Sequence, residues 1–416
     1  MTQKLTDDFL RAIPKTDLHV HIDGSLRPST LIELAKERNV ELPSYTGDGL
    51  RELVFKEHYN NLAEYLHGFK YTCAVLQDPE ALERVSYELA VDSFSEGVRY
   101  IEPRFAPQLH VSRELQMPAI LMAVDRGLKR ACDEFNATEP VQSGREPRFL
   151  YGIIVCAMRF CSGSFSRYYD SLFRAHSYSP ERHVIAMASM ELARAAVQIR
   201  DNNGVPVVGF DLAGREDGYP AHDHRKAYDF AHQNFMHKTV HAGEAYGPES
   251  IFEAITLLHA DRIGHGLFLF HVDKLESPRI TDPERYVKAL ADYVADRRVT
   301  LEICLTSNLQ TNPAIPELTN HPVRKMLDAK LSTTFCTDNR LVSSTSVSRE
   351  LRLAIDHVGL TQEQLRHCII YGFKRSFMPL KYTEKRAYVR QIIDFYEAME
   401  RCSGLEPATG STSYAD

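Results

Sequence analysis

Two histidines that alternate with apolar residues near the start of the chain form its most distinctive chemical pattern. Residues 16–25 read Thr-Asp-Leu-His-Val-His-Ile-Asp-Gly-Ser, so a single valine separates His19 from His21. Such alternation is typical of a β-strand, on which residues i and i+2 point to the same side. Both imidazoles could therefore approach one ion from a rigid element. An ordinary half-buried strand would show the same spacing, so this motif alone leaves both interpretations open.

Three further segments place histidines and acids where a short apolar run ends. The residues at these ends are His241, Glu244, His265, Asp338 and Asn339. Zinc binds imidazole nitrogen and carboxylate oxygen, and a catalytic zinc ion keeps one position for water. The metal ligands expected from the whole set are His19, His21, His241 and Asp338. Glu244 and His265 then remain available for proton transfer.

The elements that must position these residues follow a regular order along the chain. Short apolar runs predict strands at residues 17–22, 98–105, 149–156, 206–212, 239–242, 262–265, 300–305 and 332–336. Helical patterns fill most of the gaps, at residues 79–94, 117–135, 183–202, 249–258, 283–297 and 321–329. Eightfold alternation of strand and helix predicts an α/β fold, a (β/α)8 TIM barrel. Active sites of such barrels lie at the carboxyl ends of the strands, where the residues above fall.

Two stretches exceed a minimal barrel. Residues 26–78 form a helical insertion after the first strand, with helices expected at 28–38 and 62–76, and this insertion could cover the site as a lid. A long aromatic and basic loop at 157–182 follows the third strand, where packing on its own side chains and contact with substrate both stay open. We expect one metallo-dependent hydrolase barrel domain over residues 1–400 and a flexible tail at 403–416.

Composition narrows the class of protein. The chain has 416 residues, 44% of them hydrophobic, and a formal charge of −7, which argues against a nucleic-acid partner. No stretch approaches the roughly 18 apolar residues of a membrane span, and the first residues lack the apolar core of a signal peptide. The eight cysteines are scattered, without a Cys-x-x-Cys pair. We therefore expect a reduced, cytoplasmic protein that acts on a small molecule, with the oligomeric state left open.

Taken together, the polar segments resemble those of the adenosine deaminase family of metal-dependent amidohydrolase barrels. The matching segments are Asp-Leu-His-Val-His-Ile-Asp-Gly at 17–24, Asp-Leu-Ala-Gly at 211–214, His-Ala-Gly-Glu at 241–244, Gly-His-Gly at 264–266 and Thr-Asp at 337–338. Residues 100–104 and 376–379 match more weakly, and the resemblance spans roughly residues 10–395.

The resemblance implies one zinc ion per chain, held by the four ligands already named, and a role for each remaining residue. Glu244 corresponds to the proton donor, and His265 to the residue that orients and deprotonates the water, with Asp338 holding that water as well. Residues corresponding to substrate contacts are His21, Asp23 at the sugar, Gly214 through its backbone amide, and Asn339 near purine N7. Many members carry an aspartate in place of Asn339, but an amide can still donate a hydrogen bond to N7.

Three other polar residues lie near the expected site. Asp17 shares the strand face of the two histidines but lies deeper, so it either supports them or caps the strand end. Glu302 lies on the seventh strand and Asn308 just beyond it, so both could touch the pocket indirectly.

The implied activity is zinc-dependent hydrolytic deamination of adenosine and 2′-deoxyadenosine to inosine and 2′-deoxyinosine plus ammonia, in purine salvage. Adenine deaminases in the family carry glutamate at the position of Asp23, so this aspartate favours a purine nucleoside. Asn339 and the loop at 157–182 leave open the same chemistry on adenine or on a 5′- or N6-modified adenosine. A catalytically silent binding protein is a third hypothesis. The zinc site of cytidine deaminases needs a Pro-Cys-x-x-Cys segment, which the chain lacks.

Overall fold

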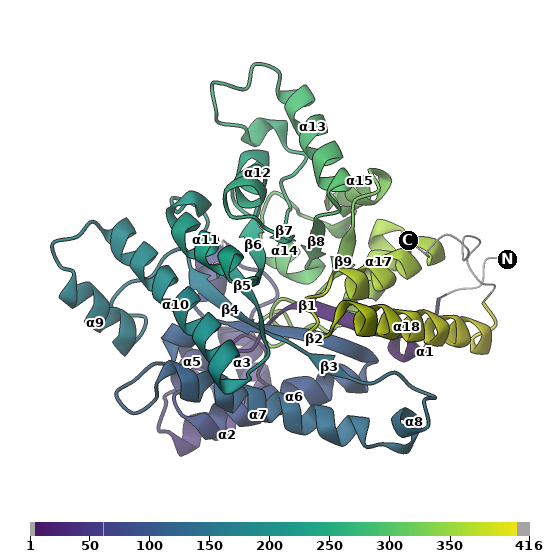
Figure 1. The fold of residues 1–416 in the computed structure, drawn as a ribbon, viewed down its shortest axis with the longest axis horizontal. Helices are drawn as coiled ribbons and strands as arrows, with labels where there is room; N and C mark the ends of the chain where they lie inside the picture. Colours follow the sequence, from purple (N-terminus) through teal and green to yellow (C-terminus); the bar gives the residue numbers. More distant parts are fainter. Residues whose placement is uncertain (1–4, 61, 406–416) are drawn as a thin grey trace.

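A single parallel sheet, closed into a barrel, organises the molecule. The computed structural model describes residues 5–60 and 62–405. Its strands are β1 (Lys15–His21), β2 (Val98–Phe105), β3 (Leu150–Tyr151), β4 (Ile153–Met158), β5 (Val207–Ala213), β6 (His237–Ala242), β7 (Arg262–His265), β8 (Thr300–Ile303) and β9 (Thr333–Phe335). They follow the order β1-β2-β4-β5-β6-β7-β8-β9, with β3 paired to β2. A parallel bridge between Val20 and Asp338 joins the end of β9 to β1, which confirms the (β/α)8 barrel (Figure 1).

The third predicted strand is interrupted in the structure. Residues 149–156 were expected to be continuous, but β3 and β4 are separated at Gly152. A Cβ atom at Gly152 would lie 2.7 Å from the γ carbons of Val208 and 3.0 Å from the hydroxyl of Tyr100. The neighbouring strands therefore approach the backbone too closely for a side chain there. β3 and β4 keep one register on β2, and the amide of Gly152 donates to the carbonyl of Ile101 at 3.1 Å, so the two short strands follow a single path.

Helices surround the barrel (Figure 1). They are α1 (Asp7–Ala12), α6 (Pro79–Ser95), α7 (Met117–Asn136), α8 (Glu139–Gln142), α10 (Glu181–Asn203), α11 (Arg225–Gln233), α12 (Pro248–Leu257), α13 (Pro283–Asp296), α15 (Val323–Asp328), α16 (Val347–Leu353), α17 (Gln362–Arg375) and α18 (Tyr382–Cys402). Their starts follow local chemistry: the Asp78 side chain accepts from the amide of Ala81 at the start of α6, and Thr361 with Gln364 forms a capping box on α17. Apolar faces of the helices and strands form one large core cluster.

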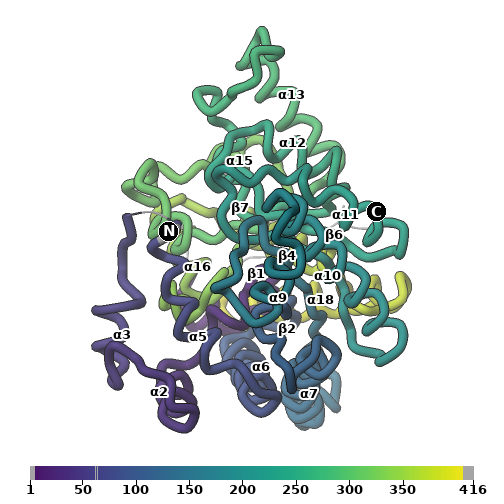
Figure 2. The backbone as a smooth tube through the Cα atoms, turned by 90° about the vertical axis from the view of Figure 1, so that its left-hand side faces the viewer, coloured from purple at the N-terminus to yellow at the C-terminus, as the bar shows by residue number. Residues whose placement is uncertain are grey.

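The insertion after β1 is helical, as predicted, but more broken than predicted. It contains α2 (Pro28–Glu37), α3 (Gly47–Leu53), α4 (Leu62–Leu66) and α5 (Phe69–Val75). The expected helix at 62–76 is interrupted before α5, and α3 forms in a stretch expected only to connect. Figure 2 shows α2, α3 and α5 together on one side of the molecule. The amide of Tyr59 donates to the carbonyl of Gln310 at 3.2 Å, which ties the insertion to α14 (Leu305–Thr311).

The excursion at 157–182 packs largely on itself. It contains α9 (Arg167–Ala175), whose first turn is capped by Ser166. Cys161 and Tyr169 are buried in a small separate cluster with Ile185 of α10. Figures 1 and 2 both place α9 on the outside of the barrel, beyond β4. The excursion thus packs partly on its own residues and partly on α10.

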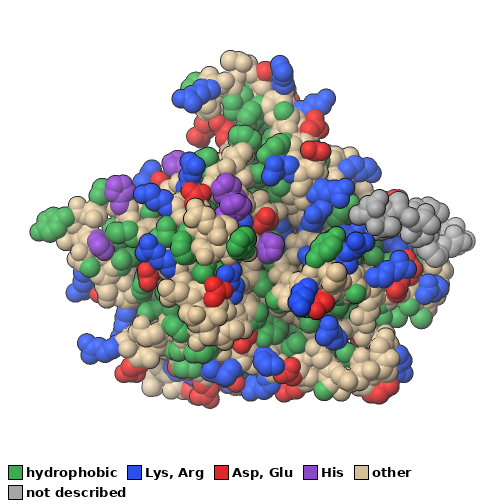
Figure 3. Space-filling model, viewed as in Figure 1, with side chains coloured by type: hydrophobic (Ala, Val, Ile, Leu, Met, Phe, Trp, Pro, Cys, Tyr) green, Lys and Arg blue, Asp and Glu red, His purple; other side chains and the backbone are tan. Residues whose placement is uncertain are grey.

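Several surface features complete the description. On the face in Figure 3, acidic and basic side chains are interspersed. In the part of the chain that the structure describes, no helix is both long and apolar enough to cross a bilayer. All eight cysteines are free. Leu405 is buried at the end of α18, and residues 406–416, which make up most of the predicted tail, lie outside the described residues.

Candidate metal and deaminase site

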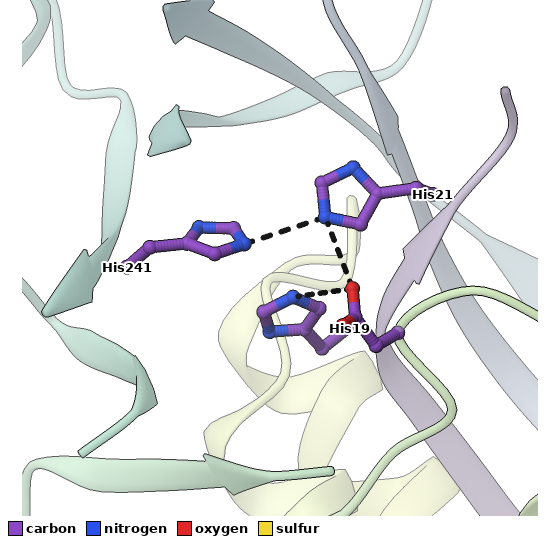
Figure 4. Close-up of side chains that lie close together, drawn as sticks. His19, His21 and His241 are labelled. Atoms are coloured by element: carbon purple, nitrogen blue, oxygen red, sulfur yellow. Dashed lines mark hydrogen bonds and ion pairs between the residues drawn. The ribbon is translucent and has the colours of Figure 1, made fainter. Parts of the chain in front are cut away.

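Three histidines and one aspartate from three different places in the chain meet at the carboxyl end of the barrel. His19 and His21 lie at the end of β1, His241 lies on β6, and Asp338 follows β9. One ligand atom from each of the four lies within 4.8 Å of all the others. The Nε2 atoms of His21 and His241 are 3.3 Å apart, and Asp338 Oδ1 lies 3.5 Å from Nε2 of both His19 and His21 (Figure 4). The predicted ligand set therefore converges.

The outer nitrogens of two of these rings are held by buried carboxylates. Nδ1 of His19 donates to Glu302 Oε2 at 2.8 Å, and Nδ1 of His241 donates to Asp211 Oδ1 at 3.2 Å. These bonds fix the proton on Nδ1 and turn an unprotonated Nε2 of each ring toward the cluster. Nε2 of His19 is buried and has no hydrogen-bond partner among the described residues. A buried acceptor without a donor is costly in a folded protein unless a cation fills the place, so the residues fit a divalent metal ion.

A buried ionic network beneath the cluster explains why these carboxylates are ionised. Arg104 donates to Asp211 at 3.0 Å and to Glu302 at 2.9 Å, and Arg262 donates to Glu302 at 2.7 Å. Burial alone would raise the pKa of Glu302, but Arg104, Arg262 and His19 hold it well below its ordinary value. Glu302, predicted to touch the pocket only indirectly, thus orients one ring of the four-residue cluster.

Asp338 is held in an uncommon backbone conformation. Its φ is 59°, in the left-handed region that most side chains avoid. Ser307 donates to its Oδ2 at 2.5 Å, while Oδ1 faces the histidines. Burial would raise the pKa of Asp338, but the nearby His19 and His21 hold it below its ordinary value, so the group is ionised. The closing bridge of the barrel with Val20 holds this strained turn in place.

His265 lies at the end of β7, also at positive φ (65°), and a relay behind it selects its tautomer. The amide of Val323 donates to Nδ1 of His321 at 3.1 Å, so the proton of that neutral ring is on Nε2, which lies 3.2 Å from Asn308 Oδ1. Asn308 must therefore present its NH2 group to His265 Nδ1, 3.0 Å away. Burial lowers the pKa of His265 well below its ordinary value. The neutral ring thus offers Nε2–H to the site.

Glu244 follows β6, and its side chain is only 9% exposed. Its Oε1 lies 3.7 Å from Nε2 of His265. Burial, together with the negative charges of Asp338 and Glu216, raises the pKa of Glu244 to about 8. The group therefore keeps its proton at neutral pH, as a proton donor requires.

The residues expected at the substrate lie on the same rim. Asp23 is buried, its Oδ1 has no partner among the described residues, and burial raises its pKa to about 7. Gly214 follows β5 at φ 92°, a conformation that favours glycine. Asn339 is also buried, and its amide donates to the hydroxyl of Tyr65 at 2.8 Å. One hydrogen of the amide expected to face purine N7 is therefore engaged by the insertion.

Sequence reasoning left several residues of the site without a role. Asp17 does not contact the histidines: it accepts from the backbone and side chain of Thr337 and from Arg340, and so anchors the loop after β9. Tyr65, His321 and Glu216 were not singled out at all. Each lies in a helix or loop without a polar motif, so no spacing signal marked it.

A family comparison decides the identity of this arrangement. The family model described as "Adenosine deaminase" matches residues 14–170 and 179–395. The chain belongs to the adenosine deaminase family. This confirms the resemblance of its motifs, and as a family member the protein is a deaminase.

Two curated relatives have similar sequences. An adenosine deaminase from Mycolicibacterium vanbaalenii is 35% identical over 395 residues, which cover 94% of this chain and 98% of the relative. A probable adenosine deaminase from Dictyostelium discoideum is 33% identical over 398 residues and 95% of this chain, which spans only 45% of that longer relative.

Two solved structures share the barrel fold. A zinc-containing amidohydrolase from Burkholderia ambifaria superposes with a TM-score of 0.75 at 20% identity, over 97% of this chain and 96% of the other. An N6-mAMP deaminase from Arabidopsis superposes with a TM-score of 0.69 at 25% identity, over 93% of this chain and 99% of the other.

Proposed function

We propose that this deaminase hydrolyses adenosine and 2′-deoxyadenosine to inosine and 2′-deoxyinosine, releasing ammonia, with one zinc ion per chain. The observation that carries the proposal is the pairing of a buried three-histidine, one-aspartate cluster with a glutamate that retains its proton. Ring deamination needs both features, since water must be activated and the purine ring must accept a proton as it is attacked. The curated relatives named adenosine deaminase support the substrate class.

The proposed ligands are His19, His21, His241 and Asp338, a nitrogen-rich set that suits zinc. When bound, zinc supplies Lewis-acid activation of water at neutral pH. The protein supplies the orientation of the rings, through Glu302 behind His19 and Asp211 behind His241.

Three side chains then act on the substrate and the attacking water. Glu244 places its proton on purine N1, so that negative charge does not accumulate in the ring. His265 donates from Nε2 and Asp338 accepts through its carboxylate, so together they hold the water over C6. With Nδ1 of His265 already accepting from Asn308, this ring acts on the water as a donor and orients it. The water releases one proton to solvent before it attacks, the proton of the new C6 hydroxyl passes to the amino group, which leaves as ammonia, and Glu244 regains its proton from solvent.

The proposed substrate contacts are Asp23 at the sugar, His21 beside it, the backbone amide of Gly214 at the ring, and Asn339 on the N7 side. A buried acid at position 23 accepts a hydrogen bond from a neutral hydroxyl but repels a phosphate when ionised. The proposal therefore favours nucleosides over nucleoside 5′-phosphates. A cytoplasmic role in purine salvage, without a nucleic-acid or membrane partner, completes it.

A substrate panel tests the proposal. The metal-loaded protein is assayed with adenosine, 2′-deoxyadenosine, adenine, adenosine 5′-phosphate and N6-methyladenosine 5′-phosphate, and ammonia release is measured. We expect the two nucleosides to have the highest kcat/KM. A higher value for adenine or for the N6-methylated nucleotide would replace the proposed substrate, and no release from any of the five would refute the proposal.

A further inference from the structure

Glu216 is a buried acid that neither the motifs nor the proposed reaction assigns. It lies in the turn after β5, two residues beyond Gly214, and is 1% exposed. Its neighbours Arg215 and Asp217 form an exposed ion pair of their own, which makes the segment look like an ordinary solvated loop. Glu216 instead points inward, toward the segment that carries Glu244.

Among the described residues, the donors to Glu216 lie in the 243–246 segment, which carries Glu244, and at Ser250 of α12. Oε2 accepts from the amides of Glu244, Ala245 and Tyr246 at 3.0, 2.6 and 3.0 Å. Oε1 accepts from the amide of Gly243 at 3.0 Å and from the hydroxyl of Ser250 at 2.5 Å. Four consecutive backbone amides thus converge on one carboxylate, which fixes the path of the chain through Glu244.

The position of Glu216 is fixed from its other side as well. Arg159, buried at the end of β4, has one Nη atom 3.9 Å from Glu216 Oε1. The guanidinium also donates to the carbonyls of Tyr219 and His241, each at 2.7 Å. Arg159 therefore links the turn that carries Glu216 to the strand that carries a proposed metal ligand.

We propose that Glu216 is the positioning residue of the proton donor, holding the 243–246 segment so that Glu244 faces the purine ring. The inference rests on the proposed function. Glu216 also acts on Glu244 through its negative charge. The charged and titratable groups that face Glu244 are Asp338 after β9, Glu216 after β5, His19 on β1, Arg159 at β4 and His265 on β7. Glu216 is one of the two acids that raise the pKa of Glu244, so it helps to keep the donor protonated.

The decisive variant is Glu216→Gln. An amide has one acceptor oxygen, so its NH2 group must face either the amides of 244–246 or the donors of Gly243 and Ser250. A segment displaced by a fraction of an ångström should cost about 10- to 100-fold in kcat, with a smaller change in KM. Loss of the negative charge should also move the alkaline limb of the pH–kcat profile to lower pH.

The matched control is Glu249→Gln. Glu249 lies on α12 and also accepts from two backbone amides, those of Glu276 and Ser277 at 2.7 and 3.2 Å, and among the described residues these amides lie outside the 243–246 segment. This variant should retain wild-type kcat and an unchanged alkaline limb. Glu216→Asp keeps the charge on a shorter side chain, so it should restore the alkaline limb while kcat stays reduced.

Amide hydrogen exchange gives a readout that needs no substrate. Peptides covering 243–246 should exchange at least about tenfold faster in Glu216→Gln than in the wild type. In Glu249→Gln, these peptides should exchange at the wild-type rate. The role of Glu216 would be overturned if Glu216→Gln exchanged these amides at the wild-type rate. It would also be overturned if this variant kept the wild-type kcat and the same alkaline limb. If Glu216→Gln does not fold, the same comparison is made with Glu216→Asp. Wild-type protein inactive on adenosine would instead refute the proposed function, while exchange still tests the positioning.

Discussion

Replacing Glu244 by glutamine removes the transferable proton but keeps the size of the side chain and a hydrogen-bond donor. With a pKa of about 8, Glu244 is protonated in about 90% of molecules at pH 7, whereas a glutamate with the ordinary value of 4.5 would be protonated in about 0.3%. The buried site therefore increases the proton-bearing fraction by about 300-fold. General acid catalysis contributes about 10² to 10⁴ in rate, so Glu244→Gln should lose at least about 10²-fold in kcat.

The sign of the pH dependence follows from the raised pKa. Ionisation removes the active form, so wild-type kcat/KM should fall as pH rises through about 8, and a bound cation would move this limb lower. The residual activity of Glu244→Gln should lack the limb. Adenosine turnover between pH 6 and 10, with Glu249→Gln as the control acid, measures both effects. A Glu244→Gln enzyme within tenfold of wild type, or one with the same alkaline limb, would refute this role for Glu244.

The same pKa predicts that Glu244→Gln, which lowers the activity, raises the stability of the fold at alkaline pH. Because the folded state binds the Glu244 proton more tightly than the unfolded state, wild-type stability falls as pH rises from about 4.5 to about 8. The cost grows by about 1.4 kcal/mol per pH unit and reaches about 3 kcal/mol at pH 7. Metal-free Glu244→Gln should therefore have a higher Tm than metal-free wild type at pH 8 and the same Tm near pH 4.5, as measured by calorimetry.

Three further substitutions test the groups around the site. Glu302→Gln replaces the carboxylate behind His19 by a neutral amide with one acceptor oxygen and should weaken metal binding by about 10- to 100-fold in a chelator competition; unchanged affinity would contradict the orienting role. Tyr65→Phe leaves the Asn339 amide without its acceptor and should cost about 1 kcal/mol in urea unfolding, together with a higher KM for adenosine; wild-type values of both would show that the insertion does not hold this amide. Asp23→Ala should raise KM for adenosine at least about tenfold and leave kcat/KM for adenine unchanged, and a parallel loss on both substrates would place Asp23 away from the sugar.

The barrel and the convergence of the four candidate ligands were predictable because both depend on local patterns. Each ligand ends an apolar run, and the carboxyl ends of parallel strands meet at one rim, so residues as distant as His19 and Asp338 could be brought together by counting strands. The helix capped by Asp78 was predicted nearly to its ends for the same reason: aspartate followed by proline marks a helix start on local grounds.

Contacts that depend on tertiary packing were not predictable. The need for glycine at position 152 comes from the close approach of Val208, which lies on a neighbouring strand and leaves no trace in the local sequence. Glu216 stands between two charged residues and resembles a solvated acid until its amide donors are seen. His321 selects the tautomer of His265 through Asn308, a relay whose members lie 13 and 43 residues apart.

The central claim is that four residues from distant parts of the chain hold one zinc ion that the reaction needs. Elemental analysis of protein purified without added metal, combined with adenosine turnover before and after chelation, tests it most directly. We predict about one zinc ion per chain in the wild type, much less in His241→Ala, and turnover that chelation abolishes and zinc restores. Metal-free wild-type protein with full turnover that chelators leave unchanged would contradict the account.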